Sequence, residues 1–270
     1  MHLSLLSVWL LLARLIEADS CSCPCKQQSQ RLASKRGIAY NDANLANKFA
    51  SNCSKCKWAY NWGGTDVGAL DPTILYVPML WSAAADHVQA WKAQAKVDSV
   101  VFSFNEPDIA GQANMTAVEA AAAHIKYMNG LPQQVYVGAP AISSSSEPSK
   151  GMSWLKDFLK ECQNQGGCRF DFCNTHWYSE KESTADKAIG AIFAHLDKLH
   201  ELCRDKPIWL TEFAFWSNDA EIQSFLKVAI PRLEELAYIE AYSYFWVAPG
   251  SLVELGGAPS SIGKVYATIE

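Results

Sequence analysis

The sequence predicts an α/β protein folded as a single-domain (β/α)8 TIM barrel that is somewhat irregular in its first half. Three observations predict this fold. After residue 36 the chain contains eight short runs with strand character, and helical patterns lie between the later runs. Regular alternation of strand and helix requires a parallel sheet. Eight strands within about 230 residues favour a closed barrel.

An open, doubly wound sheet is the alternative fold. The glycine-rich phosphate loop that such sheets often carry is missing, and the Gly166-Gly167 pair follows a predicted helix rather than a strand. The segment from Trp62 to Thr73 is too short to hold a full helix between two strands. We therefore expect a barrel whose first half is irregular in that segment.

The predicted elements alternate along the chain. The strands are expected at Gly37–Tyr40, Trp58–Asn61, Leu75–Leu80, Ser99–Asn105, Gln134–Pro140, Phe170–His176, Ile208–Glu212 and Ile239–Trp246. The helices are expected at Ala83–Lys96, Thr116–Asn129, Trp154–Gln163, Ala185–Leu202 and Asn218–Leu236. Thr116 and Glu119 form a capping box at the start of the second helix. Pro231 is expected to kink or split the last helix.

The composition is typical of a soluble globular protein. The chain has 270 residues, of which 49% are hydrophobic and 19% are charged, with a net charge of -5. Nucleic acid is not expected as a partner, because phosphate binding needs basic patches and the chain has no Lys/Arg run. Neither a His-Glu-X-X-His motif nor an Asp-rich calcium loop occurs, so we expect no metal and no cofactor. We expect a monomer.

The first 18 residues have the pattern of a secretory signal peptide. Leu3–Leu12 is an apolar stretch, and Ile16-Glu17-Ala18 precedes a plausible cleavage site. Ten apolar residues are too few to cross a bilayer as an ordinary helix, so an uncleaved anchor is the lesser alternative. We therefore expect a signal peptide at 1–18, a cysteine-rich lead-in at 19–36 and one domain at 37–270. The protein is expected to be secreted, extracellular or in a cell wall, without membrane contact once the signal is removed.

The cysteines and sequons fit this route. All nine cysteines follow the predicted cleavage site, and a secreted chain with this many thiols is expected to form disulfides. The Cys21-Ser22-Cys23-Pro24-Cys25 cluster lacks a standard zinc spacing, which favours disulfides there. Cys162, Cys168, Cys173 and Cys203 are expected to supply one or two bridges, although spacing alone does not assign the pairs. An odd number of cysteines leaves at least one without an intrachain partner.

Two Asn-X-Ser/Thr sequons add support for a eukaryotic secretory route. They are Asn52-Cys53-Ser54 and Asn114-Met115-Thr116. Such tripeptides often arise by chance, so the sequons support this compartment without establishing it.

Two predicted strands end on a glutamate. The runs are Val100–Asp108, which contains Glu106, and Pro207–Phe213, which contains Glu212. A glutamate where an apolar strand opens into a loop is held by rigid backbone while the loop admits substrate. One such residue alone is more often a solvated strand end. The pair indicates glycoside hydrolysis, which commonly needs two carboxyl groups.

The predicted carboxyl ends of the strands are also rich in residue types that bind sugars. Aromatic rings stack on the apolar faces of pyranoses, and amides, imidazoles and carboxylates bind their hydroxyls. These ends contribute Tyr40-Asn41-Asp42, Asn61-Trp62, Trp81, Asn105-Glu106, His176-Trp177-Tyr178, Glu212, Phe215-Trp216, Tyr244 and Trp246. Because the carboxyl ends of barrel strands meet at the face where active sites form, we expect a carbohydrate ligand there.

Three motifs in a fixed order make a family resemblance specific. They are Asn105-Glu106-Pro107-Asp108, His176-Trp177-Tyr178 and Trp209-Leu210-Thr211-Glu212-Phe213. Together they resemble glycoside hydrolase family 128, a fungal-type group of (β/α)8 endo-β-1,3-glucanases within the retaining clan A. The resemblance runs from about Gly37 to Val265 and includes Trp58-Ala59-Tyr60-Asn61-Trp62. Asn-Glu-Pro alone is shared by several families of that clan, whereas the ordered set is considerably more specific.

The resemblance implies the catalytic roles. Glu106, on the fourth strand, would be the general acid/base, and Glu212, on the seventh, would be the nucleophile. Their environments must then differ, because Glu212 attacks as an anion while Glu106 delivers a proton. The two carboxyl groups are expected roughly 5 Å apart, as in retaining enzymes. Asn105 would bind the sugar 2-hydroxyl, and His176 and Tyr178 would orient Glu212 or the substrate. A structural role in the core is the alternative for His176.

The predicted function is that of a secreted retaining enzyme that cleaves internal β-1,3-glucosidic bonds of cell-wall or storage glucan without a cofactor. The remaining substrate-binding candidates are Asn61, Trp62, Trp81, Trp177, Trp216, Tyr244 and Trp246. Glu180 and Glu182 lie nearby, but a charged pair in a loop is usually solvated. Two alternatives stay open: a clan A hydrolase of another β-glycan, such as mannan or β-1,4-glucan, and a non-catalytic wall-glucan-binding protein.

Overall fold

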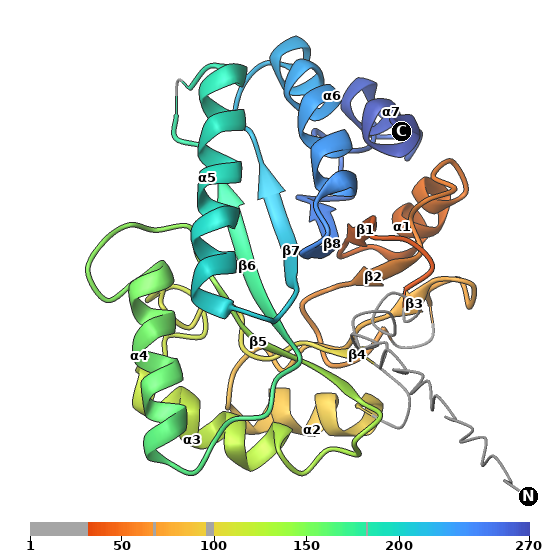
Figure 1. Cartoon of the computed structure of the whole chain (residues 1–270). Coiled ribbons are helices and arrows are strands. Elements are labelled where there is room, and N and C mark those ends of the chain that lie inside the picture. Colours follow the sequence, from red (N-terminus) through yellow and green to blue (C-terminus); the bar gives the residue numbers. More distant parts are fainter. Residues whose placement is uncertain (1–31, 67–68, 96–99, 182) are drawn as a thin grey trace, which may run out of the picture. The chain divides into compact units, whose positions relative to one another are not determined.

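Eight parallel strands and seven helices alternate along the part of the chain that the computed structural model describes, residues 32–66, 69–95, 100–181 and 183–270 (Figure 1). The strands are β1 (Gly37–Ala39), β2 (Trp58–Tyr60), β3 (Leu75–Tyr76), β4 (Val100–Val101), β5 (Tyr136–Ile142), β6 (Phe172–Tyr178), β7 (Ile208–Ala214) and β8 (Ile239–Tyr244). The helices are α1 (Ala43–Ala50), α2 (Ala85–Gln94), α3 (Ala117–Met128), α4 (Gly151–Asn164), α5 (Ala185–Cys203), α6 (Asp219–Glu235) and α7 (Ser261–Thr268). The predicted signal peptide, and the predicted lead-in as far as residue 31, lie outside the described residues.

The strands pair in chain order within two parallel sheets. β1 to β3 form a three-stranded sheet, and β4 to β8 form a curved five-stranded sheet (Figure 1). Isolated parallel bridges lie at both places where the sheets meet, between Arg36 and Tyr242 and between Met79 and Phe102. The α/β class and the parallel order are therefore confirmed, while the ladder itself is divided into two sheets.

The first half is irregular, as the sequence predicts. β3 and β4 have only two residues each, and no helix lies between β2 and β3 in the described part of that segment. The predicted strand Leu75–Leu80 is longer than β3, because Pro78 has no N–H to donate to a ladder. The carbonyl of Pro78 still accepts a hydrogen bond from the N–H of Phe102 at 2.9 Å, which keeps this edge next to β4.

All five predicted helices are present, with ends that differ from prediction by a few residues. Thr116 and Glu119 form the predicted capping box, and α6 continues through Pro231 without splitting. Helices α1 and α7 were not predicted, because eight residues are too few to show a clear helical period. Their N-terminal caps indicated them instead. Asp42 and Ser260 each accept hydrogen bonds from backbone N–H groups in the first turn of their helix. None of the described helices is long and apolar enough to span a membrane.

Two clusters of buried side chains hold the strands and helices together. One gathers side chains from strands of both sheets and includes Trp58 on β2, Phe102 after β4 and Trp209 on β7. The ring of Trp58 lies 5.1 Å from that of Trp209 and 6.0 Å from that of Phe102. Gly37 makes room for this ring, because a Cβ atom at position 37 would lie 2.1 Å from it. The other cluster joins the strands to the helices around them.

Three disulfides are present among the described cysteines: Cys53–Cys56, Cys162–Cys168 and Cys173–Cys203. The last joins the start of β6 to the end of α5 across 30 residues. Two bridges in the stretch 162–203 agree with the prediction of one or two. Cys21, Cys23 and Cys25, including the predicted unpaired cysteine, lie outside the described residues.

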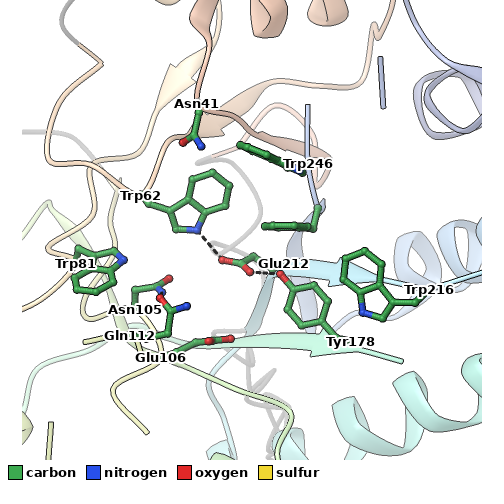
Figure 2. Close-up of a pocket in the computed structure, with 11 residues that line it drawn as sticks. Asn41, Trp62, Trp81, Asn105, Glu106, Gln112, Tyr178, Glu212, Trp216 and Trp246 are labelled. Carbon is green, nitrogen blue, oxygen red and sulfur yellow. Dashed lines mark hydrogen bonds between the residues drawn. The ribbon is translucent and has the colours of Figure 1, made fainter. Parts of the chain in front are cut away.

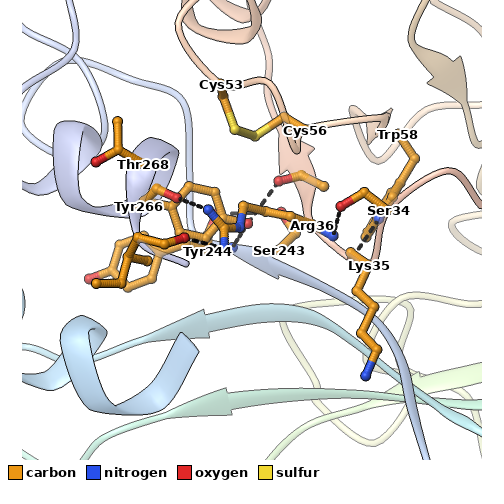
Figure 3. Close-up of a disulfide and its surroundings, with 12 residues drawn as sticks. Ser34, Lys35, Arg36, Cys53, Cys56, Trp58, Ser243, Tyr244, Tyr266 and Thr268 are labelled. Carbon is orange, nitrogen blue, oxygen red and sulfur yellow. Dashed lines mark hydrogen bonds between the residues drawn. A yellow bond between two sulfur atoms is a disulfide. The ribbon is translucent and has the colours of Figure 1, made fainter. Parts of the chain in front are cut away.

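Arg36 ties the first strand to the end of the chain (Figure 3). Its fully buried guanidinium donates hydrogen bonds to the hydroxyl of Tyr242 at 2.8 Å and to the carbonyls of Tyr266 at 2.7 Å and Ile269 at 2.9 Å. Glu234 is its carboxylate partner at 3.4 Å. A buried charge is tolerated only where its donors are paired, so Arg36 fixes β1, β8 and α7 relative to one another.

Replacing Arg36 with methionine is therefore expected to lower the free energy of unfolding by about 3 kcal/mol or more, because two buried acceptors, the partly buried carbonyl of Ile269 and Glu234 lose their donor. Urea unfolding followed by circular dichroism measures this change. The same substitution at exposed Arg204 is the matched control and should cost less than about 0.5 kcal/mol. Equal effects of the two substitutions would contradict the role given to Arg36.

Candidate active site

Glu106 and Glu212 meet at the carboxyl ends of the strands (Figure 2). Glu106 lies in the segment that follows β4, and Glu212 lies within β7. One carboxylate oxygen from each and a ring nitrogen of His176 lie within 4.8 Å of one another. This spacing agrees with the roughly 5 Å expected for the two carboxyl groups of a retaining glycosidase.

Strand register brings His176 to the carboxyl pair. His176 on β6 and Glu212 on β7 are direct partners in the parallel ladder, so both side chains point to the same face of the sheet. Nε2 of His176 lies 3.3 Å from Oε1 of Glu212. Nδ1 of the same ring is 2.8 Å from Oε1 of Glu106. The imidazole thus lies between the two carboxylates: it is hydrogen-bonded to Glu106 and within ion-pair distance of Glu212, to which Nε2 makes no hydrogen bond.

The surroundings of His176 favour its charged form. Burial of this fully buried ring by itself lowers its pKa, but the charges of Glu212 and Glu106, together with the hydrogen bond to Glu106, raise the pKa of His176 above the ordinary 6.5. An imidazolium between two carboxylates offsets their mutual repulsion. The two glutamates can therefore remain close together in a buried site.

Glu212 has more hydrogen-bond donors than Glu106. Its Oε1 accepts from Nε1 of Trp62 at 2.7 Å and from the hydroxyl of Tyr60 at 3.2 Å, and its Oε2 accepts from the hydroxyl of Tyr178. These three donors stabilise a negative charge on Glu212. Glu106 is more exposed than Glu212, 13% against 7% of the side chain, and is bonded by His176. The two carboxyl groups therefore have the unequal environments that a proton donor and an anionic nucleophile require.

Tyr60 and Tyr178 remain protonated donors at all working pH values. Burial, followed by the charge of Glu212, raises the pKa of each phenol well above the ordinary 10.0. Neither tyrosine can then contribute a second negative charge beside Glu212. The hydroxyl hydrogen of Tyr178 stays directed at the carboxylate, whereas that of Tyr60 is shared between Oε1 of Glu212 at 3.2 Å and the carbonyl of Thr211 at 3.0 Å.

The backbone is strained at two residues of the site. Glu106 has a φ of 38° and Trp62 a φ of 59°, in the left-handed region that non-glycine residues rarely adopt. The N–H of Glu106 donates to the carbonyl of Ala141 at 2.8 Å, which holds it beside β5. Asn61 accepts from the N–H of Gly63 at 2.9 Å and so closes the turn that carries Trp62. Strain of this kind persists where the surroundings enforce it, and it favours a functional role for both residues.

Asp108, the last residue of the Asn-Glu-Pro-Asp motif, fixes the loop that carries Glu106. Its buried carboxylate accepts hydrogen bonds from the N–H and the hydroxyl of Ser143, which follows β5. It also accepts from the N–H of Gly151, the first residue of α4, at 2.8 Å. The motif therefore supplies an anchor as well as a carboxyl group, a role that the sequence analysis did not assign.

Asn105 presents an unused acceptor to the site. Its Nδ2 donates to Oε1 of Gln112 at 3.1 Å, while its buried Oδ1 has no partner among the described residues. A buried acceptor without a donor costs about 1–3 kcal/mol. The substrate-binding role expected for Asn105 stays a prediction.

A cavity of about 480 Å³ opens over the carboxyl pair (Figure 2). It is lined by Asn41, Trp62, Trp81, Asn105, Glu106, Gln112, Tyr178, Glu212, Trp216, Phe245 and Trp246. Eight of the predicted site residues are therefore brought together: Trp62, Trp81, Asn105, Glu106, Tyr178, Glu212, Trp216 and Trp246. His176 joins them through its contacts with both glutamates. The aromatic rings and the few polar groups make a surface suited to a pyranose.

Three predicted substrate-binding residues lie elsewhere. Trp177 is buried and stacks on Phe225 of α6, 6.0 Å away, because alternate strand residues face opposite sides and its neighbours His176 and Tyr178 face the cavity. Tyr244 faces the helices for the same reason, paired with Phe213. Asn61 accepts from the hydroxyl of Tyr76 at 2.6 Å and supports the turn before Trp62. Trp177 and Tyr244 are therefore structural rather than substrate-binding, and Asn61 supports the turn that carries Trp62.

Three residues of the site were not selected from the sequence, namely Tyr60, Gln112 and Phe245, and Asn41 was named at a strand end without being assigned a role. Strand alternation could have predicted Tyr60, because it lies two residues after Trp58 and therefore shares the inward face of β2. Asn41 directly follows a predicted strand, which is the same position that selected the other strand-end residues. Gln112 lies in the loop after Glu106, where no periodicity indicates which side chain turns toward the cavity.

The side chains of Glu106, His176 and Glu212 could also bind a divalent cation by type, since each offers one ligand atom. The surrounding hydrogens argue against a metal. Trp62, Tyr60 and Tyr178 direct N–H and O–H groups at Glu212. Such donors stabilise an anion and would face a bound cation unfavourably. The arrangement therefore suits a pair of catalytic carboxyl groups better than it suits a metal centre.

Comparison with known proteins supplies the family context. The family model described as glycosyl hydrolase catalytic core matches residues 37–266. A solved curdlan-specific exo-β-1,3-glucanase of glycoside hydrolase family 128, subgroup III, from Blastomyces gilchristii in complex with glucose is 36% identical, with a TM-score of 0.75, over 87% of this chain and 98% of that one. A subgroup I endo-β-1,3-glucanase from Amycolatopsis mediterranei in complex with laminaritriose is 28% identical, with a TM-score of 0.72, over 87% and 98%. A subgroup IV endo-β-1,3-glucanase from Lentinula edodes is 26% identical, with a TM-score of 0.70, over 86% and 98%. A comparison with curated protein sequences finds no significant match.

The raised pKa of His176 predicts a pH-dependent contribution to stability. A histidine whose pKa is higher in the folded state contributes stability that is complete below about pH 6.5 and is lost as the pH rises through the folded-state value. The difference in free energy of unfolding between the unmodified protein and His176→Asn should therefore shrink as the pH rises above about 6.5. Urea unfolding between about pH 5 and 8 measures it.

His124→Asn is the control of opposite sign. Burial lowers the pKa of His124 to about 4, so its contribution is present above about pH 6.5 and is lost as the pH falls toward 4. If the two substitutions show the same pH trend, the charged state assigned to His176 is wrong.

Proposed function

The chain belongs to the glycosyl hydrolase catalytic core family and to glycoside hydrolase family 128, and from this premise we propose that it cleaves β-1,3-glucosidic bonds by a two-glutamate double displacement. Family membership makes the chain a glycoside hydrolase. The observation that carries the proposed mechanism is the pair of glutamates within 4.8 Å of each other, bridged by His176 and held in unequal surroundings. The three solved relatives described above are all β-1,3-glucanases, which supports this bond type.

In the first step Glu212 attacks the anomeric carbon of the bound sugar. Three donated hydrogen bonds keep its carboxylate charged and oriented before the attack. As the glycosidic bond breaks, Glu106 transfers its proton to the departing oxygen. The products of this step are the free leaving-group chain and a sugar esterified to Glu212.

In the second step Glu106 accepts a proton from water. The resulting nucleophile attacks the anomeric carbon, the ester bond to Glu212 breaks, and the sugar leaves with its original anomeric configuration. Glu106 regains its proton and Glu212 its charge. The greater exposure of Glu106, 13% against 7%, suits the residue that must meet this water.

Substrate recognition follows from the cavity lining. Oδ1 of Asn105 is a free acceptor for a sugar hydroxyl close to Glu106. Trp81 lies on one side of the carboxyl pair and Trp216 on the other, so aromatic surfaces flank the bond to be cut (Figure 2). Stacking on pyranose faces at these two rings would align a glucan chain across the glutamates.

We also propose that the two sheets belong to one (β/α)8 barrel. The bridges from Arg36 to Tyr242 and from Tyr40 to Val247 join β1 to the β8 side, and the bridge from Met79 to Phe102 joins the other edges. The inner cluster of side chains drawn from strands of both sheets supports the same arrangement. In such a barrel the carboxyl ends of all strands surround a single site.

Secretion is the setting that we propose for this activity. Three disulfides among the described cysteines support an oxidising compartment, since thiols of cytosolic proteins are usually kept reduced. An extracellular or cell-wall location would also bring the enzyme to polymeric glucan, which does not enter cells.

Substitution of each glutamate by glutamine tests the mechanism. With laminarin, Glu106→Gln is expected to lower kcat/KM by about 10²- to 10⁴-fold through loss of proton transfer, and Glu212→Gln by at least as much. With a nitrophenyl β-laminaribioside, Glu106→Gln should retain far more of its kcat/KM, because the nitrophenolate leaves without a proton, while kcat stays low because the second step still needs Glu106 as base. Glu212→Gln should stay inactive on both substrates.

Mannan and carboxymethylcellulose are the controls for bond type in the same reducing-sugar assay. Cleavage of either polymer at a rate comparable to laminarin would contradict β-1,3 specificity. If neither glutamate substitution changes the rate on laminarin, the assigned mechanism is wrong.

The position of cleavage along the polymer separates two candidate activities. Trp81 and Trp216 lie on both sides of the carboxyl pair, which favours sugars bound on both sides of the bond and therefore internal cleavage (Figure 2). The relative from Blastomyces gilchristii is an exo-β-1,3-glucanase and has the highest identity of the three, 36%, which favours attack at chain ends as the second candidate.

Early products distinguish these candidates. With laminarin and a short incubation, internal cleavage is expected to give a spread of laminari-oligosaccharides and a rapid fall in viscosity. Anion-exchange chromatography of the first products measures the spread. A single short product from the earliest time point, with viscosity nearly constant, would contradict internal cleavage and support the chain-end activity.

A further inference from the structure

We propose that Trp216 positions the nucleophile Glu212 through Tyr178, in addition to offering a surface on which a sugar can stack. This inference rests on the proposed function, because it concerns how the same site works. A simple sugar platform affects how tightly substrate binds. A positioning residue also affects the rate of the chemical step after substrate has bound.

Trp216 is attached to the end of β6 in two ways. Its indole stacks on the phenol ring of Tyr178, with ring centroids 5.6 Å apart and planes that differ by 3° (Figure 2). This is the offset, parallel arrangement that aromatic pairs favour. Its backbone N–H donates to the hydroxyl of Ser179 at 3.0 Å. The indole and the tyrosine are therefore held together by both ring contact and backbone.

Tyr178 in turn holds one oxygen of the nucleophile. Its hydroxyl donates to Oε2 of Glu212, whereas Tyr60 and Trp62 both donate to Oε1. Tyr178 is thus the donor to Oε2 among the described hydrogen bonds. A carboxylate bonded at both oxygens cannot rotate freely, and a small misplacement of a reacting atom can cost much of the rate.

Two rings set the position of Tyr178. Phe245 meets its ring edge-on, with centroids 5.5 Å apart and planes at 81°, and Trp216 covers one face. If the indole is removed, that face loses its cover and the phenol gains room to move. The hydrogen bond to Oε2 of Glu212 then depends on Phe245 and the strand backbone.

The exposure of Trp216 connects this arrangement to substrate. The side chain lines the cavity and is 48% exposed although its indole stacks on Tyr178. A glucosyl unit stacked on the remaining surface would immobilise the indole, and through it Tyr178. Binding energy from a sugar beside the reaction centre would then improve the alignment of Glu212, which raises kcat.

Trp81 provides a matched control for a platform without this connection. It lines the same cavity, and its ring packs against His87 with centroids 5.2 Å apart. No ring contact between Trp81 and Tyr178 occurs among the described residues. Loss of Trp81 should therefore weaken binding without disturbing the donors to Glu212.

The experiment compares Trp216→Leu, Trp216→Phe and Trp81→Leu on laminarihexaose and on a nitrophenyl β-laminaribioside. Trp216→Leu is expected to lower kcat by about 5- to 30-fold on both substrates, and Trp216→Phe, which keeps a stacking ring, should recover most of that loss. Trp81→Leu should raise KM and leave kcat nearly unchanged.

If Trp216→Leu raises only KM, with kcat unchanged on both substrates, Trp216 is a platform and the inference is overturned. Crystal structures of the unmodified protein and of Trp216→Leu give a readout that does not need activity. The inference predicts that the hydroxyl of Tyr178 separates from Oε2 of Glu212 in the variant, and an unchanged hydrogen bond would overturn it. An unmodified protein inactive on both substrates would instead count against the proposed function.

Discussion

The close approach of two carboxyl groups is the constraint on which the rest of the site depends. If both carboxyl groups were ionised, two unit charges within 4.8 Å of each other would repel by about 3.5 kcal/mol or more at an effective dielectric constant of 20. His176 offsets this repulsion from between Glu106 and Glu212, and the donors around Glu212 stabilise its charge in particular. The network keeps the glutamates close and unequal, which is what double displacement needs.

The scaffold supplies the precision that this network requires. The register of β6 against β7 places His176 opposite Glu212, and Asp108 anchors the loop of Glu106 to the elements that follow β5. Left-handed backbone at Glu106 and Trp62 is sustained by hydrogen bonds to rigid neighbours. Such strain is tolerated where it fixes a reacting group, and here it falls on Glu106, the proposed acid, and on Trp62, which donates a hydrogen bond to Glu212.

The sequence was sufficient for the order of elements and for the two glutamates. Alternating apolar runs and helical periods predicted the parallel α/β arrangement, and two strand ends carried the carboxyl pair. It was not sufficient for β3, where Pro78 limits the ladder, or for α1 and α7, whose eight residues show little period. These features depend on single residues and caps rather than on repeated patterns.

Side-chain direction was the weaker part of the site prediction. Trp177 and Tyr244 were expected to contact substrate because they lie at strand ends, yet strand alternation turns both toward the helices. The same alternation would have selected Tyr60, which faces inward with Trp58. Gln112 could not be found in this way, because its position depends on the path of a loop and on the hydrogen bond to Asn105.

Covalent trapping tests the central claim, that Glu212 is the nucleophile of a double displacement, most directly. The unmodified enzyme is incubated with a 2-deoxy-2-fluoro β-laminaribioside that carries an activated leaving group, then digested and analysed by peptide mass spectrometry. The account predicts a stable glycosyl adduct on the peptide that contains Glu212, attached to its carboxyl group. An adduct on Glu106, or cleavage of natural substrate with inverted anomeric configuration and no adduct, would contradict it.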